Sequence, residues 1–193
     1  DQDHIPTLVY NNTQIPDRTK SVIENKENDV RVALEESTAI LAKHCEIIAM
    51  PCNTAHYWIK YVQKIASAHN RKVLNMIEET RRYCDSNSAI KKVAVLSTLG
   101  TEKMGLYKHA FNESTTELIT LTHTEQETVM DTITQIKAAN IAPEKLVPFY
   151  NVIDKAMRNG ANGIILACTE LSLIPIPQDT IIIDPLDILA TSI

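Results

Sequence analysis

Two short segments carry the residues with the clearest chemical potential, and each is built around a cysteine. The first is PCNTAH, residues 51–56, and the second is ACTELS, residues 167–172. Each follows an apolar run that predicts a buried strand. Cys52 and Cys168 are therefore expected at the carboxyl ends of two strands, where open parallel sheets bind ligands. Two thiols placed alike can take a proton from one face of a carbon atom and return one to the other face.

The electrostatics of these positions favour such acid and base chemistry. A thiol facing the amino end of a helix has a lowered pKa, and we expect this of both cysteines. A thiolate at one site and a thiol at the other form the resting pair of a two-base, cofactor-independent racemase. The carbanion formed between them needs hydrogen-bond donors. Backbone N–H groups and the side chains of Asn53, Thr54 and Thr169 are suitable.

Three other interpretations of the cysteines remain open. A cysteine is often an inert, buried apolar residue, and this is our expectation for Cys45 and Cys84. His44, Cys45, Cys52 and His56 are zinc-type ligands, but the strand between the two cysteines separates them by roughly 20 Å. Cys52 and His56 also form a conceivable nucleophile and base for acyl transfer.

The elements that position these residues alternate between strand-like and helix-like patterns. Expected strands are residues 8–11, 47–50, 73–76, 92–96, 117–121, 163–166 and 180–183. Expected helices are residues 29–44, 54–68, 78–86, 102–111, 125–138, 143–159 and 185–193. This alternation predicts an α/β fold with mainly parallel sheets flanked by helices. We place a domain junction at Ser86-Asn87-Ser88, with a first domain over 1–88, on which 184–193 packs back, and a second domain over 89–183.

Composition narrows the function classes. The 193 residues are 44% hydrophobic with a net charge of −5, which is typical of an ordinary globular protein and gives no reason to expect nucleic acid or a membrane as partner. No apolar run reaches the roughly 18 residues that a membrane span needs. Four cysteines are too few for a disulfide scaffold. These features favour free thiols and a cytoplasmic location.

The loop after the first expected strand offers a cation for an acidic substrate. Its sequence, NNTQIPDRT over residues 11–19, is either a plain polar turn or a substrate loop in which Arg18 binds a carboxylate through two parallel hydrogen bonds. Lys137, near the end of an expected helix, is by default a solvated lysine at a favourable end of the helix dipole.

Four motifs in this order and spacing resemble the aspartate/glutamate racemase superfamily, and its aspartate racemase branch in particular. They are NNTQIPDRT, PCNTAH, STLGT at residues 97–101 and ACTELS, and the resemblance covers nearly the whole chain. It implies two similar α/β domains with the active site in the cleft between them, no pyridoxal phosphate or other cofactor, no metal, a small amino acid as substrate and a homodimer. It also implies that Cys52 and Cys168 are the catalytic acid and base. The implied substrate-binding residues are Asn12, Gln14, Arg18, Asn53, Thr54, Thr98, Lys137, Thr169 and Glu170.

One departure from the family pattern affects the expected function. The opening strand and glycine-rich loop, of the form GGMGPxAT, have no counterpart, so an amino-terminal β–α unit is expected to be missing. The first hypothesis is an isomerase that interconverts L- and D-aspartate, or glutamate, through two-cysteine proton transfer. One alternative is a truncated, inactive ligand-binding protein. The other is an isomerase or racemase of the same fold that acts on a different substrate.

Overall fold

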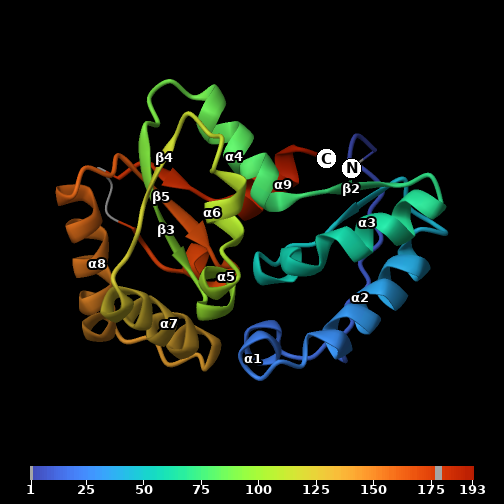
Figure 1. The fold of residues 1–193 in the computed structure, drawn as a ribbon, viewed down its shortest axis with the longest axis horizontal. Helices are drawn as coiled ribbons and strands as arrows, with labels where there is room; N and C mark the ends of the chain where they lie inside the picture. The colour runs from blue at the N-terminus through green and yellow to red at the C-terminus, as the bar shows by residue number, and fades with distance from the viewer. Residues whose placement is uncertain (1, 177–179) are drawn as a thin grey trace.

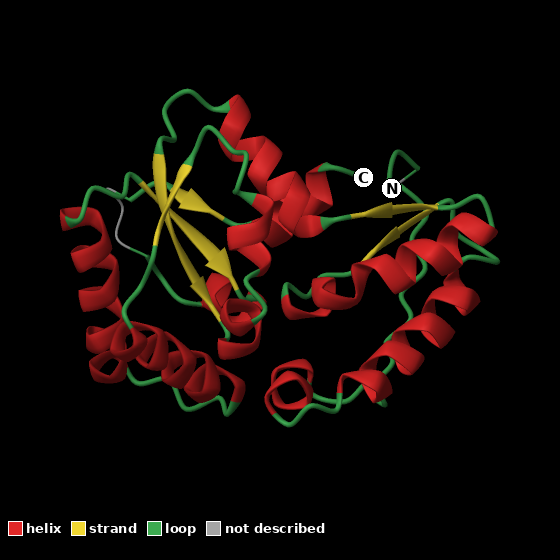
Figure 2. Cartoon of the chain, in the orientation of Figure 1, coloured by secondary structure: helices red, strands yellow, loops and turns green. Residues whose placement is uncertain are grey.

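The computed structural model describes residues 2–176 and 180–193, which form two parallel sheets with helices around them (Figures 1 and 2). The smaller sheet pairs β1 (Ile47–Ala49) with β2 (Lys72–Leu74). The larger sheet has the order β4-β3-β5-β6, with every neighbouring pair parallel. Its strands are β3 (Lys92–Ser97), β4 (Glu117–Ile119), β5 (Gly163–Ala167) and β6 (Ile182–Ile183). The predicted α/β fold with parallel sheets is confirmed.

Helices cover both faces of the larger sheet and one side of the smaller one (Figure 1). The α-helices are α1 (Arg18–Ile23), α2 (Glu27–Leu41), α3 (Ile59–Ala68), α4 (Met76–Ser86), α5 (Leu99–Lys103), α6 (Leu106–Ala110), α7 (His123–Lys137), α8 (Val147–Arg158) and α9 (Pro185–Thr191). Short 3₁₀ helices are η1 (Thr54–Trp58), η2 (Pro143–Leu146) and η3 (Thr169–Leu173). None of the helices within the described ranges is long and apolar enough to cross a membrane.

The central strand β5 explains why the larger sheet needs both helical layers. All five of its residues are buried, and alternate side chains enter different cores, as the period of two in a strand requires. Ile164 and Leu166 pack with Phe149 of α8 and its neighbours from α7. Ile165 packs on the opposite side with Cys84 of α4 and with residues of α6. A strand buried on both faces has a continuous apolar sequence, which is what residues 163–167 show.

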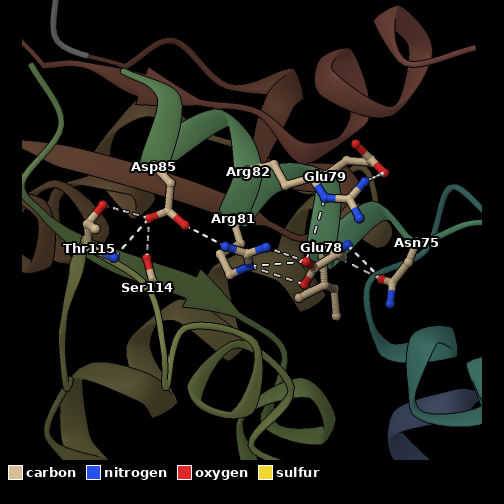
Figure 3. A network of polar contacts seen from close by, with 9 residues as sticks. Asn75, Glu78, Glu79, Arg81, Arg82, Asp85, Ser114 and Thr115 are labelled. Carbon is tan, nitrogen blue, oxygen red and sulfur yellow. Dashed lines mark hydrogen bonds and ion pairs between the residues drawn. The ribbon is translucent and has the colours of Figure 1, made fainter. Parts of the chain in front are cut away.

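Helix α4 packs on the larger sheet, although the expected junction at residues 86–88 places residues 78–86 in the first domain. Cys84 lies in the same buried cluster as strands β3 and β5. Figure 3 shows the polar side of this attachment: Arg81 of α4 bonds to Asp85, and Asp85 accepts hydrogen bonds from Ser114 and Thr115, which precede β4. The chain therefore passes from one sheet to the other at Asn75, which caps α4 through its side chain. We call residues 18–75 the small lobe and residues 76–176 with 180–193 the large lobe.

Helix α9 joins the two lobes. It packs along α4, and its Leu189 is buried with Leu74 and Met76 at the lobe junction. Leu186 and the β1 residue Ile47 lie against the same cluster. Helix α9 therefore contacts both the small lobe and the large lobe.

Three local predictions need correction. Among the described residues, the strand expected over 8–11 joins neither sheet, because no neighbouring strand pairs with it. Residues 11–17 form the expected polar loop, but Arg18 and Thr19 at its end begin helix α1, which Asp17 caps by accepting a hydrogen bond from the Lys20 N–H group. The helix expected over 102–111 is divided into α5 and α6, because Gly105 takes a left-handed conformation with φ of 60°.

Candidate active site

Both cysteines singled out in the sequence line one cavity of about 90 Å³ between the lobes. Its walls come from the start of α1, the segment after β1, and the carboxyl ends of β3 and β5, with Lys137 at the end of α7. The lining residues are Asp17, Arg18, Thr19, Pro51, Cys52, Asn53, Thr54, Thr98, Lys137, Ala167, Cys168, Thr169 and Glu170. Larger grooves of about 1010 and 540 Å³ elsewhere on the described surface contain neither thiol.

Parallel strand pairing brings the cavity residues of the large lobe together. Ser97 at the end of β3 lies opposite Ala167 at the end of β5. The next residues, Thr98 and Cys168, therefore leave the sheet at the same edge, as ligand-binding residues do in open parallel sheets. Cys52 reaches the cavity in a similar way, three residues beyond Ala49, the last residue of β1.

A carboxylate partners the Cys168 thiol. Cys168 is only 7% exposed, and its Sγ donates a hydrogen bond to Glu170 Oε2 at 2.9 Å. Burial and this carboxylate raise the pKa of Cys168 well above its ordinary value. The expected lowering by a helix terminus is therefore wrong for this cysteine. The structure favours a protonated Cys168, which suits a proton donor.

Lys137 and Glu170 form the charged border of the cavity on the same side. Lys137 Nζ lies 3.6 Å from Glu170 Oε1. Burial alone would raise the pKa of Glu170, but the hydrogen bond from Cys168 and the charge of Lys137 bring it below its ordinary value. Glu170 is thus an anion at neutral pH. It accepts a hydrogen bond from the Cys168 thiol, and the proton stays on the sulfur.

Arg18 supplies a second positive charge from the small lobe. Its guanidinium donates to the Pro16 carbonyl oxygen at 3.2 Å and lies 3.5 Å from that of Ile15. These contacts involve one terminal nitrogen, Nη1, so the other nitrogens retain donors for a carboxylate. Arg18 and Lys137 therefore present two cations to one small cavity.

Three threonine hydroxyls connect the lobes beside the thiols. Thr54 Oγ1 of the small lobe lies 3.0 Å from Thr98 Oγ1 and 2.9 Å from Thr101 Oγ1, and the last two are 3.1 Å apart. Each hydroxyl carries one proton, so three mutual hydrogen bonds use all three protons. Thr54 and Thr98 can then donate to a substrate only if this hydroxyl triangle opens.

Two of the predicted substrate residues lie outside the cavity. Asn12 donates through Nδ2 to Ser37 Oγ at 2.9 Å, and its Oδ1 accepts from the Gln14 N–H group at 3.0 Å. Gln14 itself is exposed. Both residues thus shape the turn ahead of α1. Conversely, Asp17 and Thr19 line the cavity without having been predicted; the helix-capping pattern at Asp17 was the available signal.

His56 is a structural residue rather than a partner of the Cys52 thiol. Its Nδ1 donates to the Cys52 carbonyl oxygen at 2.9 Å, and its Nε2 accepts from the Met76 N–H group at 3.0 Å. Burial lowers the pKa of His56 to about 4, so the ring is neutral. With both nitrogens bound to backbone, the acyl-transfer pair loses its base. No three His, Cys, Asp or Glu side chains in 2–176 and 180–193 gather closely enough to hold a metal ion.

Known proteins share this architecture. The chain is similar to the structure of an aspartate racemase from Picrophilus torridus, at 30% identity over the whole chain and 79% of that protein, with a TM-score of 0.83. An aspartate racemase homologue from Pyrococcus horikoshii shares the fold at 22% identity, covering 100% of this chain and 84% of that one, with a TM-score of 0.77.

A curated relative aligns with this chain over only about half of its own length. The broad specificity amino-acid racemase RacX from Bacillus subtilis is 30% identical over 129 residues, which are 67% of this chain and 54% of RacX. The chain therefore spans about half the length of this relative. The model of the Asp/Glu/Hydantoin racemase family matches residues 1–193, and the chain belongs to that family.

Proposed function

We propose that this chain interconverts L- and D-aspartate by moving protons at Cα between Cys52 and Cys168, without pyridoxal phosphate. The observation that carries the proposal is that both thiols line one small cavity, together with Arg18 and Lys137. Such a cavity suits a small substrate with two carboxylates. The proposal includes the homodimer and the cytoplasmic location that the family resemblance implies.

In the proposed reaction, the Cys52 thiolate takes the α-proton, so that an S–H bond forms as the Cα–H bond breaks. The electron pair spreads into the substrate's carboxylate. Cys168 then gives its thiol proton to the opposite face of Cα and becomes a thiolate. Its hydrogen bond to Glu170 keeps it protonated until the carbanion forms. The opposite enantiomer uses the same steps in reverse.

Stabilisation of the carbanion falls to the polar groups at the cavity. A positive charge near the developing negative charge lowers the barrier most in a site that excludes water. Arg18 and Lys137 are cations there, and Asn53 offers an amide N–H group. The similarity to the aspartate racemase from Picrophilus torridus, which is 30% identical over the whole chain, supports aspartate as the substrate.

The test is deuterium uptake at Cα from D₂O into L- and D-aspartate, measured alongside racemisation. We expect Cys52→Ser and Cys168→Ser each to lose at least about 100-fold in rate, because each removes one acid or base step. Cys45→Ser is the control: Cys45 is free and does not line the cavity. Parent-like rates in both cavity variants would exclude the mechanism.

A panel of amino acids tests the alternatives. The name of RacX, broad specificity amino-acid racemase, favours a wider range of substrates. Comparable rates with neutral amino acids would replace aspartate specificity with this broader activity. Binding of aspartate without any exchange would instead favour the inactive, ligand-binding alternative.

A further inference from the structure

Asn53 is the cavity residue whose side chain is most tightly buried while still holding an unused donor. Asn53 as a whole is 3% exposed, and its side-chain nitrogen Nδ2 has no hydrogen-bond partner among the described residues. A buried amide N–H group without a partner costs stability, so its retention at a cavity wall points to a ligand as the missing acceptor. An N–H donor in this position suits a carboxylate.

The other end of the same amide is held by a residue outside the cavity. The hydroxyl of Tyr107 on α6 donates to Asn53 Oδ1 at 2.6 Å. Because Oδ1 accepts the hydrogen bond from Tyr107, the orientation of the amide plane is fixed. The NH₂ group of Asn53 then faces away from Tyr107. Asn53 belongs to the small lobe and Tyr107 to the large lobe, so the contact also depends on how the lobes meet.

Tyr107 is well suited to hold this position rigidly. Its ring is buried in the core of the large lobe with Phe111, Cys84 and Ile165, at 6.1 Å between the ring centres of Tyr107 and Phe111. Burial raises the pKa of Tyr107 far above its ordinary value, so the hydroxyl keeps its proton at every working pH. It is therefore a permanent donor toward Asn53.

We propose that Tyr107 is a positioning residue, whose hydroxyl orients the Asn53 amide so that its N–H group binds the substrate's carboxylate. The inference rests on the proposed function, because it assigns the amide to the same cavity and the same acidic substrate. Tyr107 does not line the cavity and acts only through Asn53.

The decisive variant is Tyr107→Phe, which removes the hydroxyl and keeps the ring. One hydrogen bond contributes about tenfold to an equilibrium constant, so we expect kcat/KM for α-proton exchange in aspartate to fall roughly tenfold, mainly through KM. Tyr150→Phe is the matched control: Tyr150 donates to the Pro175 carbonyl oxygen at 2.9 Å, away from the cavity. It should keep the parent's kcat/KM.

A double-mutant cycle separates positioning from general structural damage. In an Asn53→Ala background, Tyr107→Phe should lower kcat/KM no further, because its only route to the substrate is gone. An equal loss in both backgrounds, or no loss in the parent, overturns the proposal. All variants are compared at a temperature where circular dichroism shows each to be folded.

A readout independent of activity completes the test. The Asn53 side-chain amide signal in a ¹⁵N NMR spectrum is assigned by its absence in Asn53→Ala. We expect Tyr107→Phe to shift that signal in the ligand-free protein, and an unshifted signal overturns the proposal. Failure of the proposed function looks different: the parent protein then exchanges no α-proton of aspartate, while the amide signal still shifts.

Discussion

Glu170→Gln tests whether the carboxylate beside Cys168 keeps that thiol protonated. The substitution preserves size and removes the negative charge of the carboxylate. At present Oε2 of this carboxylate accepts a hydrogen bond from Cys168 Sγ at a distance of 2.9 Å. The amide of glutamine can also donate to a thiolate, which a carboxylate cannot do. Both effects stabilise the thiolate relative to the thiol. The pKa of Cys168 should therefore fall in the variant.

The size of the effect follows from the contact. A hydrogen bond to a charged group is worth about 1.5–3 kcal/mol net, which corresponds to a roughly 10- to 100-fold larger thiolate fraction at a given pH below the pKa. Burial is the larger cause of the raised pKa of Cys168 and is unchanged by the substitution. The pKa in the variant should therefore remain above that of a free cysteine.

Alkylation by iodoacetamide measures this shift, because the thiolate is the reacting species. The rate at Cys168 is followed by mass spectrometry across a pH series, and the profile of Glu170→Gln should lie at lower pH than that of the parent. Limited access slows the reaction equally at every pH and does not move the profile. Glu125→Gln, whose carboxylate pairs with Lys155 at 2.7 Å elsewhere, is the control. A profile at the same or higher pH in Glu170→Gln refutes the assignment.

Three further predictions concern the junction of the lobes. Thr101→Val removes one corner of the hydroxyl triangle and should lower the free energy of unfolding in urea by about 1–3 kcal/mol; an unchanged value contradicts the buried contact. Gly100→Ala should reduce both the melting temperature and the racemisation rate, because a Cβ there would lie 2.9 Å from Thr19 Cα and 3.1 Å from Thr54 Cγ2. The pKa of His56 is lowered to about 4 in the fold against 6.5 when unfolded, so the unfolded chain takes up the proton first. Urea titrations should show that stability is fully present above pH 6.5 and falls by about 3 kcal/mol as the pH drops to 4.

The sequence predicts the elements around the thiols well because their signals are local. Apolar runs that end abruptly at Cys52 and Cys168 mark the carboxyl ends of β1 and β5. These strands belong to different sheets, and the two thiols reach one cavity because the lobes meet there. The acidic neighbour Glu170 is only two residues from its cysteine, so the family motif already contained it. Arg18 and Lys137 reach the same cavity from distant segments, and only the resemblance linked them.

What the sequence misses depends on choices between distant partners. The periodicity of α4 predicts an apolar face but does not indicate which of the two sheets that face covers. The triangle of Thr54, Thr98 and Thr101 and the contact of Tyr107 with Asn53 join separate segments, and no spacing indicates them. Helix α1 was missed because six mostly polar residues give too weak a pattern for a helix.

The position of α9 has a consequence for biosynthesis. Leu189 completes the apolar cluster formed by Leu74 and Met76, yet it is translated more than a hundred residues later. Until α9 has been synthesised and has left the exit tunnel, the apolar surface at the junction stays uncovered in the nascent polypeptide. Chaperone binding to stalled nascent chains should therefore persist until residues 185–191 have emerged from the exit tunnel.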